Sequence, residues 1–109
     1  MDSKAKGKEG ENRACMYLEE MGYEVLERNF RHSRSEIDVI ALLQNQLLVF
    51  VEVKMRSRAD YGEPEHFVDE NQQEKIREAA DHYIHEINWE KDIRFDIISI
   101  EKSGELRHI

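Results

Sequence analysis

Apolar and polar residues recur along the chain with periods that separate two helical segments from five extended ones. Residues 9–21 place Ala14, Leu18 and Met21 on one helical stripe with Tyr17 beside it, and Gly22 suits the C-terminal cap. A second helix is predicted over residues 70–87, with its apolar stripe at Ile76, Ala79, Ala80, Tyr83, Ile84 and Ile87. The pattern therefore predicts two amphipathic helices, each with one buried face.

The extended segments lie between and after these helices. Residues 23–30 are expected to form a strand that ends in a basic turn at 31–34. Residues 35–43 alternate with a period of two, and 44–46 favours a hairpin turn into 47–51, which is apolar on both faces like a covered central strand. Two further strands are predicted at 93–100 and 106–109, separated by a turn. The order α-β-β-β-α-β-β predicts an α/β fold with a mixed sheet between helices.

The composition agrees with one small domain. The chain has 109 residues, 39% of them hydrophobic and 37% charged, which is enough apolar material for one modest core. We expect a flexible tail at residues 1–8 and a single domain at residues 9–109. Cys15 is the single cysteine and is expected to be a buried, inert thiol. With neither a signal peptide nor a membrane-spanning apolar run expected, the sequence favours a cytoplasmic protein.

The central apolar run ends in Glu52, Val53 and Lys54, where polarity returns on one face only. Residues two apart in a strand point the same way, so Glu52 and Lys54 share a face. If residues 35–43 pair with this strand as a hairpin, Asp38 and Glu52 are about equally far from the turn and come close together. Two carboxylates and one ammonium group would then converge at one end of the sheet.

Converging carboxylates repel one another unless a cation lies between them. Their oxygens suit Mg²⁺ or Mn²⁺, and the backbone carbonyl of Val53 could complete the ligand set. In phosphodiester hydrolysis Lys54 would position or deprotonate a water, or stabilise the charge that develops on phosphorus. The Glu-x-Lys spacing alone favours a solvated salt bridge instead, and the acid at Asp38 makes the two interpretations about equal.

The charge distribution bears on a nucleic-acid partner. The formal net charge of −8 disfavours phosphate binding, yet residues 26–58 carry six basic against four acidic side chains, a net +2. Within or beside this region, Arg31, Arg34, Arg56 and Arg58 flank the predicted site and either contact phosphates or are solvated loop charges.

Other candidate groups favour structural interpretations. His82 with His85 or Glu86 could imitate a zinc pair on one helix, but no third ligand follows at a suitable spacing, so surface histidines are expected. Trp89 and Phe95 are expected in the core, not as base-stacking platforms, because both lie in or beside apolar segments. The Tyr-Gly pair at 61–62 is interpreted as a lid or a turn above the site.

Several segments together resemble the bacterial YraN family, over about residues 7–101. They are Gly-Glu at 10–11, Gly-Tyr at 22–23, Leu-Glu-Arg-Asn-Phe-Arg at 26–31, Glu-Ile-Asp-Val-Ile-Ala at 36–41, Val-Phe-Val-Glu-Val-Lys at 49–54, Arg-Ser at 56–57, Tyr-Gly at 61–62 and the helix at 73–80. The resemblance implies a restriction-endonuclease-like fold of the PD-(D/E)XK nuclease superfamily, similar to archaeal Holliday-junction resolvases.

The same resemblance assigns residues. Asp38, Glu52 and Lys54 match the signature positions, and Glu11 matches the acid that the first helix often contributes. Accessory positions match at Glu36 and Gln73. The chain departs from the family pattern at Ser35, where glycine is usual, at Gln72, where a basic residue is common, and in the acidic second helix. These departures concern DNA affinity more than the metal site.

Three functional hypotheses follow. The first is a metal-dependent nuclease that hydrolyses DNA phosphodiester bonds, at branched or flapped DNA by resemblance to resolvases, with a homodimer joined through the exposed terminal strand. The second is a non-catalytic nucleic-acid-binding or adaptor protein that retains the nuclease fold, favoured by the charge of −8 and the acidic second helix. The third is hydrolysis of a smaller phosphate ester.

Overall fold

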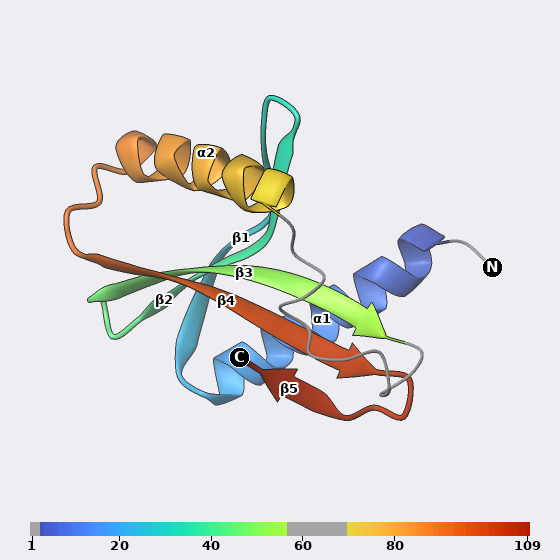
Figure 1. Ribbon diagram of the computed structural model, residues 1–109. Coiled ribbons are helices and arrows are strands. Elements are labelled where there is room, and N and C mark those ends of the chain that lie inside the picture. Colours follow the sequence, from blue (N-terminus) through green and yellow to red (C-terminus); the bar gives the residue numbers. More distant parts are fainter. Residues whose placement is uncertain (1–2, 57–69) are drawn as a thin grey trace.

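The computed structural model describes residues 3–56 and 70–109, and the side chains of residues 8–55 and 71–109 (Figure 1). The elements in order are α1 (Ser3–Glu20), β1 (Tyr23–His32), β2 (Ser35–Leu43), β3 (Leu47–Arg56), α2 (Glu70–Glu86), β4 (Asp92–Glu101) and β5 (Leu106–His108). This is the predicted order of elements. The α/β class, with the strands between two helices in the predicted order, is therefore confirmed.

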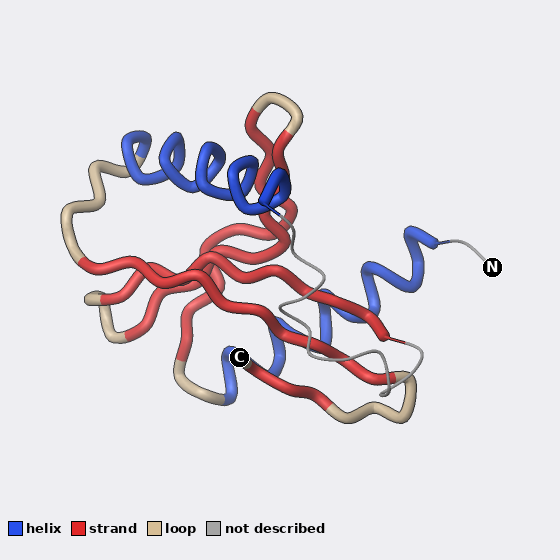
Figure 2. Tube along the Cα trace, viewed as in Figure 1, coloured by secondary structure: helices blue, strands red, loops and turns tan. Residues whose placement is uncertain are grey.

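The five strands form one sheet in the order β1-β2-β3-β4-β5, which is the central layer of the molecule (Figure 2). β3 and β4 are parallel, and every other neighbouring pair is antiparallel, so the sheet is mixed as predicted. A parallel neighbour requires a crossover, and α2 lies within the connection from β3 to β4. β3 is thus a central strand with a partner on each side.

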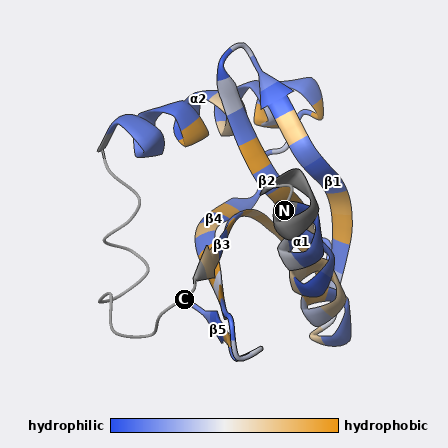
Figure 3. Cartoon of the chain, turned by 90° about the vertical axis from the view of Figure 1, so that its right-hand side faces the viewer, coloured by the Kyte–Doolittle hydropathy of each residue, from blue (hydrophilic) through white to orange (hydrophobic). Residues whose placement is uncertain are grey.

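The two helices cover opposite faces of the sheet (Figure 3). Ala14 and Leu18 of α1 pack on one face, where Val49 and Val51 of β3 are buried. Ala79, Ala80 and Tyr83 of α2 pack on the other face of the sheet. There they contact Leu48 and Phe50 of β3, which alternate with Val49 and Val51, and Ile40 of β2. Because side chains alternate along a strand, the apolar run of β3 supplies both cores.

The β2–β3 hairpin has a tight turn that fixes its register. Gln44 and Asn45 both adopt positive φ (53° and 57°), the conformation of a type I′ turn, and the Gln46 amide donates to the Leu43 carbonyl at 3.0 Å. The ladder then runs from Leu43↔Leu47 to Val39↔Val51. The predicted hairpin is confirmed, and its register carries Asp38 and Glu52 to the far end of the ladder.

The ends of several elements differ from the prediction. α1 begins at Ser3, earlier than residue 9, and β1 continues to His32, so that only Ser33 and Arg34 remain in the predicted basic turn. Met21 and Ile87 do not belong to the buried stripes: their exposures are 58% and 39%. Each follows the last residue of its helix, so the chain has already turned away from the apolar face.

Of the two aromatic residues predicted to lie in the core, one does and one does not. Trp89 packs partly buried against the α2 core, as expected, and Cys15 is buried with a free thiol. Phe95 is not a core residue, because the residue is 45% exposed. It lies in the first half of β4, before residues 98–100 that pair with β5, and at the margin of the surface covered by α2. Among the described helices, none has the length and apolar character needed to cross a membrane.

Candidate metal centre

The candidate centre lies where β2 and β3 separate. Val39↔Val51 is the last pair of their ladder, and Asp38 and Glu52 are the next residue on each strand. Beyond this point the Val53 amide donates to Asp38 Oδ2 at 2.8 Å. A carboxylate thus takes the place of the next backbone acceptor. This contact brings the Asp38 side chain beside Glu52.

Burial and mutual repulsion act on both acids. Burial, then the charge of Asp38, raises the pKa of Glu52 from 4.5 to about 7, although Lys54 opposes this shift. Burial also raises the pKa of Asp38; the Val53 amide and Lys54 oppose this, while Glu36 and Glu11 add to it. Two partly buried carboxylates therefore share a region with too little positive charge to keep both ionised easily.

Two side chains contact Glu52 directly. Lys54 Nζ lies 3.5 Å from Glu52 Oε1, and the two side chains are only 24% and 15% exposed. Gln72 Nε2, from the first turns of α2, donates to the same oxygen at 3.3 Å. Glu52 and Lys54 are thus largely buried, and do not form the solvated salt bridge that was the alternative interpretation of their spacing. One face of β3 and the start of α2 together hold this carboxylate.

Glu11 lies on the α1 side of the same region and is buried. Its Oε1 accepts from Arg28 Nε at 2.9 Å and from Asn29 Nδ2 at 2.8 Å. It is close enough to Asp38 to raise the pKa of that carboxyl. Glu11 therefore adjoins Asp38 where β2 and β3 separate, and it is held there by two donors from β1.

The backbone of Val53 also faces the separation between the strands. In a strand the N–H and C=O groups of one residue project toward the same neighbouring strand. The Val53 N–H reaches Asp38, so the Val53 carbonyl lies on the same edge of β3, facing β2. The Val53 carbonyl oxygen and the Asp38 carboxyl group therefore both lie along the edge of β3 that faces β2.

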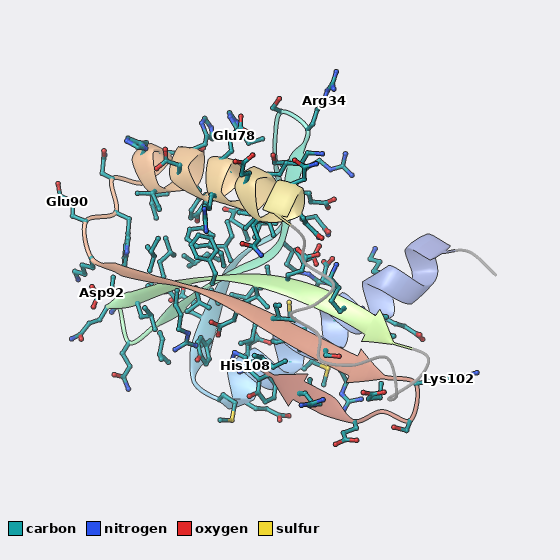
Figure 4. The ribbon with its side chains drawn as sticks, viewed as in Figure 1. Arg34, Glu78, Glu90, Asp92, Lys102 and His108 are labelled. Atoms are coloured by element: carbon teal, nitrogen blue, oxygen red, sulfur yellow. The ribbon has the colours of Figure 1, made fainter. Side chains whose placement is uncertain are left out.

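The other predicted site residues occupy the periphery. Glu36 is exposed, with Arg31 Nη2 3.8 Å from its Oε2, and Gln73 lines a cavity that Glu52 also lines. Arg34 extends from the tip of the β1–β2 hairpin, away from the sheet (Figure 4). The Arg56 side chain, Arg58 and the Tyr-Gly pair at 61–62 lie outside the described residues.

Sequence reasoning missed three contributors. Gln72 was not assigned to the site, although it donates to Glu52. Arg28 and Asn29 were not assigned either, although they hold Glu11. The only available signal was that Arg28 and Asn29 fall within a segment resembling the YraN family. A contact between residues 17 or 18 positions apart on different elements leaves no periodicity in the sequence.

Histidine does not contribute to this centre in the part of the chain described. His82 and His85 are exposed on α2, as expected, and His82 Nε2 lies 3.4 Å from a Glu86 oxygen. Across residues 3–56 and 70–109, no cluster of three or more His, Cys, Asp or Glu side chains is arranged to hold a metal ion. A cation here would depend on two carboxylates, a carbonyl and water.

Comparison with known proteins adds a family. A sequence model with the description "Uncharacterised protein family UPF0102" matches residues 10–100. The chain belongs to the UPF0102 family. A UPF0102 protein of Cytophaga hutchinsonii is 44% identical over 100 residues, covering 92% of this chain and 88% of that protein. Another, from Persephonella marina, is 46% identical over 101 residues, covering 92% and 86%. The resemblance to the YraN family is thereby confirmed.

One solved structure is similar at a low level. It is entitled "The structure of Pyrococcus Furiosus SfsA in complex with Ca2+", with a TM-score of 0.37 and 14% sequence identity. The match covers 98% of this chain and 62% of that chain. A likeness of this size carries no information about the centre in this UPF0102 member, whose interpretation depends on its own residues.

Proposed function

We propose that this chain is a metal-dependent nuclease that hydrolyses DNA phosphodiester bonds, at branched or flapped DNA, in the cytoplasm. The observation that carries the proposal is the meeting of Asp38 and Glu52 where β2 and β3 separate, with Lys54 Nζ 3.5 Å from Glu52. An acid pair with one ammonium group is the donor set expected for phosphodiester hydrolysis.

The donors fit a hard divalent cation. Asp38, Glu52 and the Val53 carbonyl offer only oxygen, which suits Mg²⁺ or Mn²⁺. The raised pKa of Glu52, caused by burial and by Asp38, is what two carboxylates show before a cation compensates their charge. When bound there, such an ion would neutralise phosphate oxygens and lower the pKa of an attacking water.

The chain's own groups have separate roles in this proposal. Lys54 places a fixed positive charge beside Glu52, where it can orient the attacking water or stabilise charge on the phosphate. Gln72 keeps Glu52 Oε1 in place, and the Val53 amide keeps Asp38 in place. Glu11 adds negative charge behind Asp38 and is itself oriented by Arg28 and Asn29.

Basic groups near the centre would engage the nucleic-acid backbone. The tip of the β1–β2 hairpin, with Arg31 and Arg34 near it, projects beyond α2 (Figures 1 and 3). From there both side chains can contact phosphates of the nucleic-acid backbone on the hairpin side of the centre. A homodimer formed through the short edge strand β5 would present two such centres to a symmetric junction.

The alternative is an adaptor that keeps the fold without useful catalysis. Its support is the net charge of −8 together with the exposed acids of α2, among them Glu74 and Glu78. Both charges oppose the approach of a polyanion.

The test combines metal binding with cleavage. Calorimetric titration with Mn²⁺ should give saturable binding that Asp38→Asn and Glu52→Gln abolish, while Glu24→Gln, an exposed acid of β1, leaves it unchanged. The rate at which fork, flap and four-way-junction DNA is cleaved in Mg²⁺ should fall at least about a hundred-fold in Lys54→Ala. This is the loss expected when one group that stabilises transition-state charge is removed. If the wild type and Lys54→Ala leave every substrate equally intact, the nuclease proposal is wrong and the adaptor is favoured.

A further inference from the structure

A cavity of about 220 Å³ lies directly beside the candidate centre, between α2 and the sheet. Its walls are mainly apolar, and the charged residues that line it are Glu52, Arg77 and Asp96. Phe50, Ile76, Phe95 and Ile97 supply much of the apolar lining. Glu52 belongs both to this cavity and to the centre. Any group in the cavity would therefore adjoin a phosphate held by the centre.

Phe95 gives the cavity an exposed aromatic wall. Its ring lies 5.4 Å from the ring of Phe50, centroid to centroid, with 26° between their planes. Phe50 is 1% exposed and fixed in the core, whereas Phe95 is 45% exposed. A large aromatic side chain with one face backed by a buried ring and much of its surface open is a platform on which another flat ring can stack.

The size and polarity of the cavity select the occupant. Its volume is below the roughly 300 Å³ at which drug-sized pockets begin, so it suits one ring system and not a dinucleotide. The apolar walls favour a flat, uncharged group, and Arg77 and Gln73 can reach polar atoms at its edge. A nucleobase combines these properties, and its own phosphate would lie toward Glu52.

We propose that this cavity binds one unstacked nucleobase of the nucleotide next to the cleaved bond, with its ring on Phe95. The inference rests on the proposed nuclease function, since that function places the phosphate beside Glu52. Removing a base from a duplex stack costs a few kcal/mol, and least where the base is already unpaired. The substrate class is therefore nucleic acid with an unpaired nucleotide at the cleavage site, such as a flap or a single strand.

The experiment uses a flap oligonucleotide with 2-aminopurine at the unpaired position, in Ca²⁺ so that binding can be measured apart from cleavage. In the wild type the probe should be shielded from acrylamide quenching. Phe95→Ala should bind about ten-fold more weakly and lose the shielding, because one base–aromatic stack is worth roughly 1–3 kcal/mol. Phe95→Tyr should bind within about two-fold of the wild type. Ile93→Ala is the matched control, since Ile93 is exposed on the same face of β4 but does not line this cavity.

An abasic nucleotide at the same position gives the decisive comparison. It should weaken wild-type binding about as much as Phe95→Ala does, and the two changes together should cost no more than one alone. Equal binding and shielding in the wild type and Phe95→Ala would overturn the base site, as would an oligonucleotide that the wild type does not bind. Phe95-dependent shielding without cleavage in Mg²⁺ would support the base site and contradict the nuclease proposal. Cleavage at the same rate in the wild type and Phe95→Ala would support the nuclease proposal and contradict the base site.

Discussion

Asp38 Oδ2 accepts a hydrogen bond from the Val53 amide at 2.8 Å, immediately beyond the last paired residues of β2 and β3. The same side chain thus satisfies a backbone donor where the ladder has ended and raises the pKa of Glu52. Its removal has a structural effect and an electrostatic effect, and different substitutions separate the two.

Asp38→Ala should lower the free energy of unfolding by about 1–3 kcal/mol, because it leaves the partly buried Val53 amide without its acceptor. Asp38→Asn keeps an acceptor oxygen and should lose less. Urea unfolding of both variants measures the difference, with Asp92→Ala, an exposed acid at the start of β4, as control. Equal losses in Asp38→Ala and Asp38→Asn would show that the amide bond is not what stabilises this end of the hairpin.

Glu52 should make the metal-free protein less stable as pH rises from about 4.5 to about 7. Its pKa in the folded state is raised from 4.5 to about 7, so the folded chain binds more protons than the unfolded chain across that interval. The stability at pH 5 should therefore exceed that at pH 7.5 by about 2 kcal/mol from this group alone. Unfolding in the presence of a chelator measures it.

Glu52→Gln removes the titrating group and should flatten this pH dependence. Glu24→Gln should not flatten it. Because the histidines titrate in both variants, their contribution cancels when the two pH profiles are compared. Adding Mn²⁺ at pH 7.5 should restore stability to the wild type but not to Glu52→Gln. The same slope in wild type and Glu52→Gln would contradict the assignment of the raised pKa.

Glu11→Ala should destabilise the fold by about 2 kcal/mol, because Arg28 and Asn29 both lose the carboxylate oxygen to which they donate. Glu11→Gln keeps an acceptor and should cost about half as much. Thermal unfolding compares them with Glu9→Ala, an exposed acid on the same helix. A Glu11→Ala protein as stable as Glu9→Ala would mean that this pair of hydrogen bonds contributes nothing measurable.

Ser99→Ala should raise the free energy of unfolding by about 1 kcal/mol. Within the described ranges the Ser99 hydroxyl is buried and has no hydrogen-bond partner, so folding removes it from water without compensation. Ser103→Ala changes an exposed serine in the following turn and should be neutral. Chemical denaturation decides the matter, and a loss of stability in Ser99→Ala would reveal a partner for this hydroxyl.

The parts of the molecule that were predictable are those built from local patterns. The two-residue period of β2 and the symmetry of Asp38 and Glu52 about the 44–46 turn were sufficient to bring these acids together. The exposure of Phe95 was not predictable, because Ile93, Phe95 and Ile97 form an apolar face of β4 whose burial depends on how far α2 extends over it. Gln72 likewise reaches Glu52 only through the packing of α2 on the sheet.

The β2–β3 hairpin has a consequence for how the chain acquires its parts during folding. Asp38 and Glu52 are joined by a short stretch of chain with one tight turn, so little loop-closure entropy opposes their approach. Phe95 joins them only after the crossover through α2 has closed and β4 has docked in parallel. Local contacts thus suffice to assemble the acidic pair, whereas the aromatic wall beside it requires the completed tertiary structure.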